Sequence, residues 1–102
     1  MNEVSVLFVC MGNICRSPTG EGVFRHYVRD AEYDDVIRID SAGMSGYHVG
    51  AQADDRMRAA AIKRGYQLDS IARQVRWEDI DMFELIVPMD HENLADLERL
   101  AG

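Results

Sequence analysis

The sequence predicts an α/β fold: a three-layer α/β/α arrangement around a central parallel sheet. Three observations predict it. Short apolar runs alternate with stretches of helical periodicity, which is typical of parallel strands joined by helical crossovers. The run from Val4 to Val9 is almost continuously apolar, as in a strand buried on both faces. No repeat or Pro/Gly/Ser-rich linker divides the 102 residues, so 1–102 is expected to form a single domain.

The first strand is followed by helix signals. Ser17 is a candidate N-cap with Pro18 at the first helical position. Apolar residues at helical spacing predict the buried stripe of this helix, and Gly20 and Gly22 indicate close packing within it. The predicted stripe consists of Val23, Phe24, Tyr27, Val28 and Ala31.

Two further strands and two further helices are expected. Residues 36–39 predict the second strand, and a glycine-rich loop follows over 41–50. Asp54 is a candidate cap for a helix that carries Met57, Ala60, Ala61 and Ile62 and ends at Gly65. The third strand is predicted over 83–87, and Asp90 is expected to cap a last helix with Leu94, Leu97 and Ala101 on one side. In parallel sheets the functional residues lie at the carboxyl ends of the strands, so Cys10, Ser41 and Asp90 should lie together at one edge of the sheet.

Composition excludes several classes of partner and predicts a compartment. The formal charge of −7 argues against nucleic acid and anionic membrane surfaces. Two cysteines are too few for a disulfide scaffold and suit a reducing environment. Glu3 near the start and a short apolar run resemble neither a signal peptide nor a membrane span. We therefore expect a soluble cytoplasmic protein.

The loop from Cys10 to Arg16 has the composition of an anion site. Gly12 and Asn13 tolerate left-handed backbone, so successive N–H groups can converge on a phosphate-sized anion at a helix N-terminus. Arg16 adds a planar two-pronged donor. The same positive field should lower the pKa of Cys10 and make it a thiolate aimed at phosphorus, with Ser17 as a further donor.

Plainer readings stay open for these residues. Cys10 could be an ordinary buried cysteine at a strand end, because a cysteine and an arginine at this spacing are weak indicators alone. A zinc site is not expected, because the cysteine spacing is wrong and His26, His48 and His91 form no ligand pair. No metal and no cofactor are therefore predicted.

Five stretches together resemble the low-molecular-weight protein tyrosine phosphatase family: VLFVCMGNICRSP, GEGVFRHYV, IDSAGMSGYHVG, ARQV and MDHENLADLERL. The resemblance covers essentially the whole chain. It implies Cys10 as nucleophile, Arg16 as phosphate-binding arginine and Ser17 as partner of the thiolate. Cys15 would form a reversible disulfide with the nucleophile under oxidation. The rest of the phosphate-binding loop would be Met11, Gly12, Asn13 and Ile14, with Asn13 and Ser41 supporting it.

The resemblance also implies a substrate. Tyr47 and His48 correspond to residues that wall the family's active-site cleft, although a partly exposed loop tyrosine is the plainer reading. Ile14 resembles the tyrosine-directed members, whereas relatives acting on phosphoarginine have threonine there. Asp90 is a candidate for orienting Arg16 or merely a helix cap. Phosphotyrosine proteins or aryl phosphates would be substrates, and inorganic phosphate an inhibitor.

Two departures from the family pattern qualify this expectation. Ser70 stands where many members have a histidine, which questions part of the hydrogen-bond network that supports the loop. The family's Asp-Pro loop, whose aspartate protonates the leaving phenolate, has no counterpart, since only Pro18 and Pro88 occur and neither follows aspartate. We therefore expect a chain truncated at its C-terminal side, with no general acid and reduced activity.

One consequence of a missing strand and two alternative functions stay open. An open edge on the third strand could form a homodimer. The chain could instead be a non-catalytic module that binds phosphate or phosphopeptides. It could also be an arsenate reductase, but the thioredoxin-coupled kind needs two cysteines downstream of Cys15 and none follows.

Overall fold

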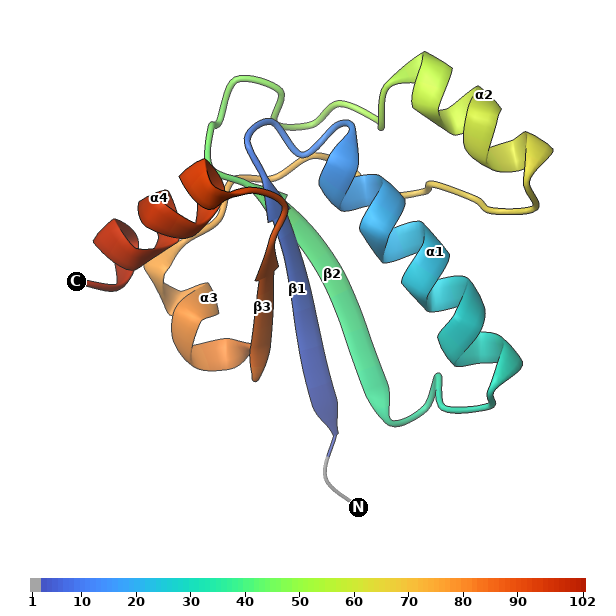
Figure 1. The fold of residues 1–102 in the computed structure, drawn as a ribbon, viewed down its shortest axis with the longest axis horizontal. Helices are drawn as coiled ribbons and strands as arrows, with labels where there is room; N and C mark the ends of the chain where they lie inside the picture. Colours follow the sequence, from blue (N-terminus) through green and yellow to red (C-terminus); the bar gives the residue numbers. More distant parts are fainter. Residues whose placement is uncertain (1–2) are drawn as a thin grey trace.

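Three parallel strands form the sheet in the order β2-β1-β3, with β1 in the centre (Figure 1). The computed structural model describes residues 3–102. The predicted parallel α/β fold is confirmed. Its elements are β1 Val4–Cys10, α1 Arg16–Asp30, β2 Ile37–Gly43, α2 Asp55–Lys63, α3 Trp77–Met82, β3 Leu85–Pro88 and α4 His91–Ala101.

Alternation along β1 divides its side chains between two layers of helices. Phe8 faces α1 and meets Phe24 edge-to-face, with 5.8 Å between the ring centroids. Leu7 and Val9 point to the other side and pack in the main core with residues of α4 and the end of α3, including Leu97 and Phe83. The sheet is thus covered on both faces. In register, Cys10 lies opposite Gly43 of β2, and Val9 lies opposite Pro88 of β3.

Helix α1 differs from the prediction at its start and on its buried face. It begins at Arg16 with Cys15 at the N-cap position, and no side chain caps it. The predicted cap Ser17 instead directs its hydroxyl to the sulfur of Cys10. Of the predicted stripe only Val28 is buried, and Tyr27 is exposed. The inner face consists of small or polar residues because it packs closely on β1 and on residues 67–68: a Cβ at Gly20 would lie 2.9 Å from Phe8.

The second and third strands also differ from the prediction. β2 runs past Ser41 to Gly43, so the predicted loop begins later, because β2 stays paired with β1 up to Cys10, which lies opposite Gly43. The N–H and C=O of Gly43 also bond to the backbone of Arg73 and Val75. β3 is shorter than predicted, and α3 was not predicted at all. With six residues, α3 is too short to show periodicity.

The predicted ends of α2 and the start of α4 are confirmed. Asp54 caps α2 by accepting hydrogen bonds from the N–H groups of Arg56 and Met57. Gly65 follows α2 with a φ of +87°, a left-handed conformation that glycine adopts without strain. Asp90 caps α4 by accepting from the N–H of Asn93.

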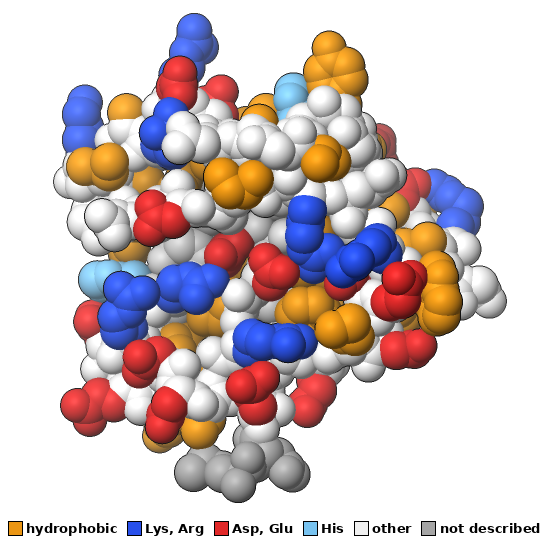
Figure 2. Space-filling view, turned by 180° about the vertical axis from the view of Figure 1, so that it is seen from behind, with side chains coloured by type: hydrophobic (Ala, Val, Ile, Leu, Met, Phe, Trp, Pro, Cys, Tyr) orange, Lys and Arg blue, Asp and Glu red, His pale blue; other side chains and the backbone are white. Residues whose placement is uncertain are grey.

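Charged side chains of both signs alternate on the face shown in Figure 2. Arg73 lies between Asp40 and Asp79, and Arg25 pairs with Glu21. In the part of the chain that the structure describes, no helix has the length and apolar character needed to cross a membrane. Over the same residues, no three His, Cys, Asp or Glu side chains are grouped as metal ligands.

Candidate active site

The loop between β1 and α1 is folded back on itself by one left-handed residue. Asn13 has a φ of +58°, a conformation that asparagine tolerates better than most residues. The carbonyls of Cys10, Met11 and Ile14 accept hydrogen bonds from the backbone N–H groups of Met44, Ser45 and Asp54. Because these carbonyls bond to neighbouring segments, the N–H groups are left to converge on the other side of the loop, next to the uncapped start of α1.

Gly43 allows β2 to approach this loop closely. A Cβ at Gly43 would lie 2.9 Å from the carbonyl oxygen of Met11 and 3.0 Å from the nitrogen of Asn13. Any larger residue would therefore push the strand and the loop apart.

The Asn13 side chain holds the loop with three hydrogen bonds. Its Nδ2 donates to the hydroxyls of Ser17 at 2.8 Å and Ser41 at 3.0 Å, and its Oδ1 accepts from the N–H of Arg73 at 3.0 Å. Both the amide nitrogen and the amide oxygen of this buried side chain thereby have hydrogen-bond partners, which fixes the side chain in one position. The loop is tied to α1, to β2 and to the segment after α2.

The sulfur of Cys10 lies at the centre of these donors. Its Sγ is 3.0 Å from the Ser17 hydroxyl and accepts from the Asn13 N–H at 3.2 Å. Burial alone would raise the pKa of this thiol, but hydrogen bonds from the Ser17 hydroxyl and from the N–H groups of Ser17, Asn13 and Gly12 outweigh it and lower the pKa below its ordinary value. The geometry thus favours the thiolate.

Arg16 is held at the cavity by Asp90. Its Nη1 donates to Oδ2 of Asp90 at 2.7 Å. Oδ1 of the same carboxylate caps α4 through the N–H of Asn93. The hydrogen bonds from Asn93 and then from Arg16 lower the pKa of Asp90, so it is ionised at neutral pH. Asp90 therefore makes both contacts that the sequence left as alternatives, one with each oxygen.

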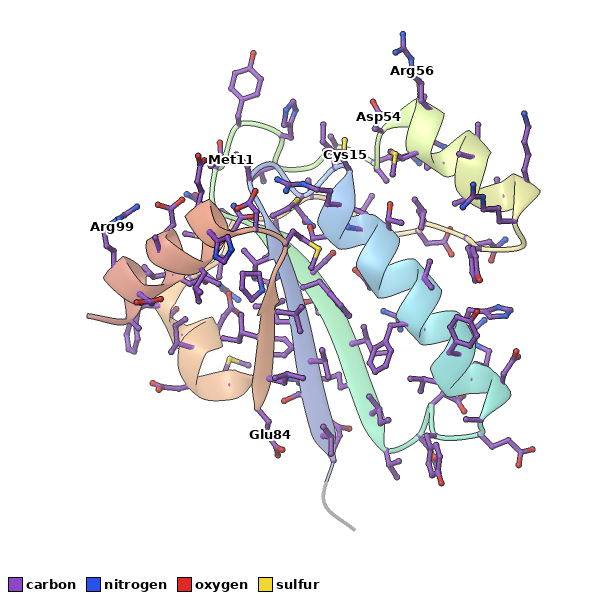
Figure 3. All side chains as sticks on the ribbon, viewed as in Figure 1. Met11, Cys15, Asp54, Arg56, Glu84 and Arg99 are labelled. Carbon is purple, nitrogen blue, oxygen red and sulfur yellow. The ribbon has the colours of Figure 1, made fainter. Side chains whose placement is uncertain are left out.

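An open cavity of about 470 Å³ lies over the loop. Tyr47 projects into solvent at its rim, and its ring meets His48 edge-to-face, with 4.8 Å between their centroids. Figure 3 shows Met11 and Cys15 at the same end of the molecule, with Asp54 beside Cys15. No carboxylic acid lines this cavity among residues 3–102. The lining residues are Cys10, Met11, Gly12, Ile14, Cys15, Arg16, Ser45, Tyr47 and His48.

The pKa values of the two thiols in this cavity are shifted in opposite directions. Burial and the nearby negative charge of Asp54 raise the pKa of Cys15, whereas that of Cys10 is lowered. Both cysteines are free thiols. The surroundings therefore favour the thiolate form at Cys10 and the neutral thiol at Cys15.

Two residues that the sequence did not indicate, Glu21 and Arg73, also support the loop. Oε1 of Glu21 accepts from the Ser41 hydroxyl at 2.5 Å, and its Oε2 pairs with Arg25. Arg73 bonds to Asn13 through its N–H, and its guanidinium contacts Asp40 and Asp79. Four-residue spacing makes Glu21 and Arg25 look like an exposed helix pair, and nothing near Arg73 in sequence indicates its partners.

Ser70, the departure noted in the sequence, contributes nothing to this network. Its hydroxyl oxygen is buried and has no hydrogen-bond partner in the described structure. The network that reaches Asn13 runs through Ser41, Glu21 and Arg73 instead.

Comparisons with known proteins agree with this geometry. A family model for low molecular weight phosphotyrosine protein phosphatase matches residues 5–102. The mouse protein of that name is 50% identical over 95 residues, which are 93% of this chain and 60% of the mouse protein. The chain thus spans about three-fifths of the length of the curated relatives it matches.

Solved structures share the fold closely. Bacillus subtilis YfkJ superposes with a TM-score of 0.97 at 40% identity, covering 100% of this chain and 65% of that one. A protein tyrosine phosphatase from Entamoeba histolytica, with Hepes in its active site, gives a TM-score of 0.93 at 43% identity, covering 95% and 62%.

Proposed function

The chain belongs to the low molecular weight phosphotyrosine protein phosphatase family, and from that premise we propose that it hydrolyses phosphotyrosine through a phosphocysteine on Cys10. One observation carries the proposal: a buried sulfur whose pKa is lowered by four hydrogen-bond donors at an uncapped helix N-terminus. A thiolate in this position faces any oxyanion bound by the loop.

The proposed reaction has two displacements at phosphorus. Cys10 attacks the phosphorus, a bond from Sγ to phosphorus forms, and the bond to the phenolic oxygen breaks with its electron pair. Water then attacks the phosphocysteine, releasing inorganic phosphate and the thiolate. In both steps the loop N–H groups and Arg16, held by Asp90, stabilise the negative charge on the equatorial oxygens. Ser17 stabilises the departing sulfur anion in the second step.

Protonation of the leaving group is expected to limit the rate at which this chain hydrolyses phosphotyrosine. Phenolate has a pKa of about 10, and a missing general acid costs about 10²–10⁴-fold in rate. Since the cavity lining among the described residues offers no carboxylic acid, we expect slow turnover of phosphotyrosine and faster turnover of esters with acidic leaving groups.

The cavity favours an aromatic ester. Tyr47 and His48 offer ring faces and edges beside the loop, which suits a phenyl ring. Oxyanions such as inorganic phosphate should compete with substrate. Hepes, found in the active site of the Entamoeba relative, carries a sulfonate of similar shape.

Three finer expectations belong to the same proposal. Cys15 shares the cavity with Cys10 and would supply the second sulfur of a protective disulfide. A reducing cytoplasm would keep both cysteines as free thiols. β3 is an edge strand in the described sheet and could pair with a second copy.

Pre-steady-state kinetics with p-nitrophenyl phosphate test the proposal. We expect a burst of about one p-nitrophenolate per chain followed by slower turnover, and its loss in Cys10→Ser. Cys15→Ser, which removes the other thiol of the cavity, should keep the burst. Binding of phosphate without any burst would favour the phosphopeptide-binding module, and hydrolysis by Cys10→Ser would refute the nucleophile.

A further inference from the structure

The aromatic wall of the cavity over Cys10 depends on the backbone that carries it. Tyr47 is 87% exposed, and its ring meets the His48 ring edge-to-face. The His48 ring in turn lies on the phosphate-binding loop, since a Cβ at Gly12 would be 3.0 Å from its Cδ2. A side chain as exposed as Tyr47 is placed by its main chain, so residues 44–48, here called the wall segment, set where the ring stands.

Hydrogen bonds to the phosphate-binding loop hold the start of the wall segment. The N–H groups of Met44 and Ser45 donate to the carbonyls of Cys10 and Met11. The Ser45 hydroxyl accepts from the N–H of Tyr47 at 3.1 Å, which makes a local turn. These bonds use N–H groups of the segment and leave the Met44 carbonyl to a partner from elsewhere in the chain.

Gln74 supplies that partner. Its Nε2 donates to the carbonyl oxygen of Met44 at 3.0 Å. Its Oε1 lies against Gly46, where a Cβ would be 2.9 Å away, so glycine lets the amide approach the main chain directly before Tyr47. Among the described residues, Gln74 is the one side chain from outside the wall segment that hydrogen-bonds to it.

The backbone of Gln74 is itself held in place. It lies opposite Gly43 in a parallel bridge, and the N–H and C=O of Gly43 bond to its two neighbours, Arg73 and Val75. The N–H of Arg73 also donates to Oδ1 of Asn13 in the loop. The Gln74 side chain therefore extends from a base that is bonded to the loop, and replacing that side chain leaves these backbone bonds in place.

We propose that Gln74 is a positioning residue that sets the selectivity of this site for aryl phosphates. Its amide holds the wall segment so that the rings of Tyr47 and His48 stand beside an aryl group while the loop binds the phosphoryl group. This role rests on the proposed function and extends it to a residue outside the cavity lining. Loss of the amide should weaken binding of the aryl part of a ligand and spare binding of the phosphoryl part.

Two anions separate these parts. Phenylphosphonate has a ring and no ester bond to break, and inorganic phosphate has no ring, so both can be titrated calorimetrically against the whole chain without turnover. In Gln74→Ala, phenylphosphonate should bind about three- to tenfold more weakly, the contribution of one neutral hydrogen bond, and phosphate should stay within about twofold of the parent.

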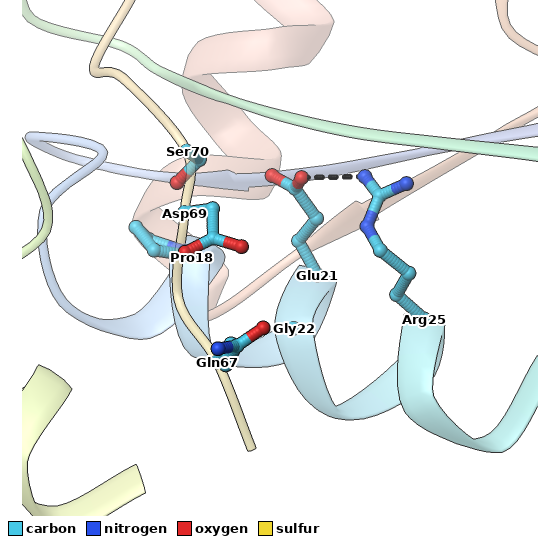
Figure 4. Close-up of a pocket in the computed structure, with 7 residues that line it drawn as sticks. All are labelled: Pro18, Glu21, Gly22, Arg25, Gln67, Asp69 and Ser70. Carbon is cyan, nitrogen blue, oxygen red and sulfur yellow. Dashed lines mark hydrogen bonds and ion pairs between the residues drawn. The ribbon is translucent and has the colours of Figure 1, made fainter. Parts of the chain in front are cut away.

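Matched variants show whether the hydrogen bond and the ring are responsible. Gln74→Met keeps a side chain of similar length without an N–H donor and should behave as Gln74→Ala does. Gln67→Ala removes an exposed glutamine at a separate cavity beside α1 (Figure 4) and should bind both anions as the parent does. In a Tyr47→Ala background the effect of Gln74→Ala should shrink, because the ring that Gln74 positions is absent.

Several results would overturn this role of Gln74. They are unchanged phenylphosphonate binding in Gln74→Ala, equal weakening of both anions, parent-like binding in Gln74→Met, and an undiminished effect in Tyr47→Ala. If the unaltered chain bound neither anion, the proposed function would fail together with this role. If it bound both but gave no burst with p-nitrophenyl phosphate, the phosphatase activity would fail, and the two affinities would still decide the role of Gln74.

Discussion

Replacing Ser17 with alanine should slow alkylation of Cys10 near neutral pH and speed it at high pH. The Ser17 hydroxyl lies 3.0 Å from the Cys10 sulfur in a fully buried position, and its hydrogen bond helps to lower the pKa of the thiol. Ser17→Ala removes this donor, so the pKa of Cys10 rises toward the value that burial favours. The backbone donors of Gly12, Asn13 and residue 17 remain and limit the rise.

The size of the effect follows from two opposing terms. A hydrogen bond to a charged group contributes about 1.5–3 kcal/mol, which reduces the thiolate fraction about 10- to 100-fold at a pH below both pKa values. A more basic thiolate is also a better nucleophile, with a Brønsted coefficient of about 0.5. This gain offsets the loss of alkylation rate by about the square root of the same factor. The net slowing should be about 3- to 10-fold at low pH. Above both pKa values the variant should react faster by a similar factor.

The assay is the rate of iodoacetamide labelling of Cys10 against pH, measured in a Cys15→Ser background so that only one thiol is present. Ser5→Ala is the control, because Ser5 is another buried serine, lies on β1 and bonds through its hydroxyl to the backbone of Met82 and Glu84, away from Cys10. Its profile should match the parent. Superimposable profiles for Ser17→Ala and Ser5→Ala would refute the assignment of Ser17 as a donor to the thiolate.

Three further predictions concern the supports of the loop. Asn13→Ala should lower the free energy of unfolding by about 2–4 kcal/mol in urea titrations, since alanine is strained at a φ of +58° and three buried partners lose their bonds; Asn13→Gly, which relieves only the strain, should lose less, and an equal loss would contradict this division. Asp90→Asn keeps an oxygen to cap α4 but loses the charge that holds Arg16, so it should weaken competitive inhibition by phosphate up to about tenfold with little change in melting temperature; a large fall in melting temperature would show that the cap dominates. Burial raises the pKa of Asp79, but hydrogen bonds from the Arg73 side chain and the Arg76 N–H lower it overall. The stabilisation that ionised Asp79 gives the fold is therefore complete above its ordinary pKa of about 3.9 and is lost as the pH falls through the lower folded value. Melting temperatures between about pH 5 and pH 2 should fall less steeply in Asp79→Asn than in the parent, and parallel curves would contradict the direction of this pKa shift.

Local signals in the sequence predicted the parts of the fold that depend on neighbouring residues. The caps at Asp54 and Asp90 and the stop at Gly65 were right, because the groups concerned lie within a few residues of each other. The loop could be described from Gly12 and Asn13 for the same reason. The cap at Ser17 was wrong because the hydroxyl has a better partner, the sulfur of Cys10, across the loop.

Long-range contacts determined what the sequence could not predict. β2 extends to Gly43 because it pairs with β1 as far as Cys10, and residues 73 and 75 bond to the other side of Gly43. The buried carboxylate of Glu21 accepts a hydrogen bond from Ser41 of β2. The short helix α3 depends on Asp79, which accepts from the Arg76 N–H and from the Arg73 guanidinium. None of these partners can be found from periodicity or spacing.

The central position of β1 sets an order for assembly during translation. The strand that carries Cys10 is made before the other two strands of the described sheet, yet one of its two neighbours is β3, and the ion-pair partner of Arg16 lies 74 residues downstream. A nascent chain that has not yet released Asp90 from the ribosome cannot orient that arginine. Arg16 therefore lacks its ion-pair partner until nearly the whole of these 102 residues has emerged, although the groups that bond to the Cys10 sulfur are all within seven residues of it.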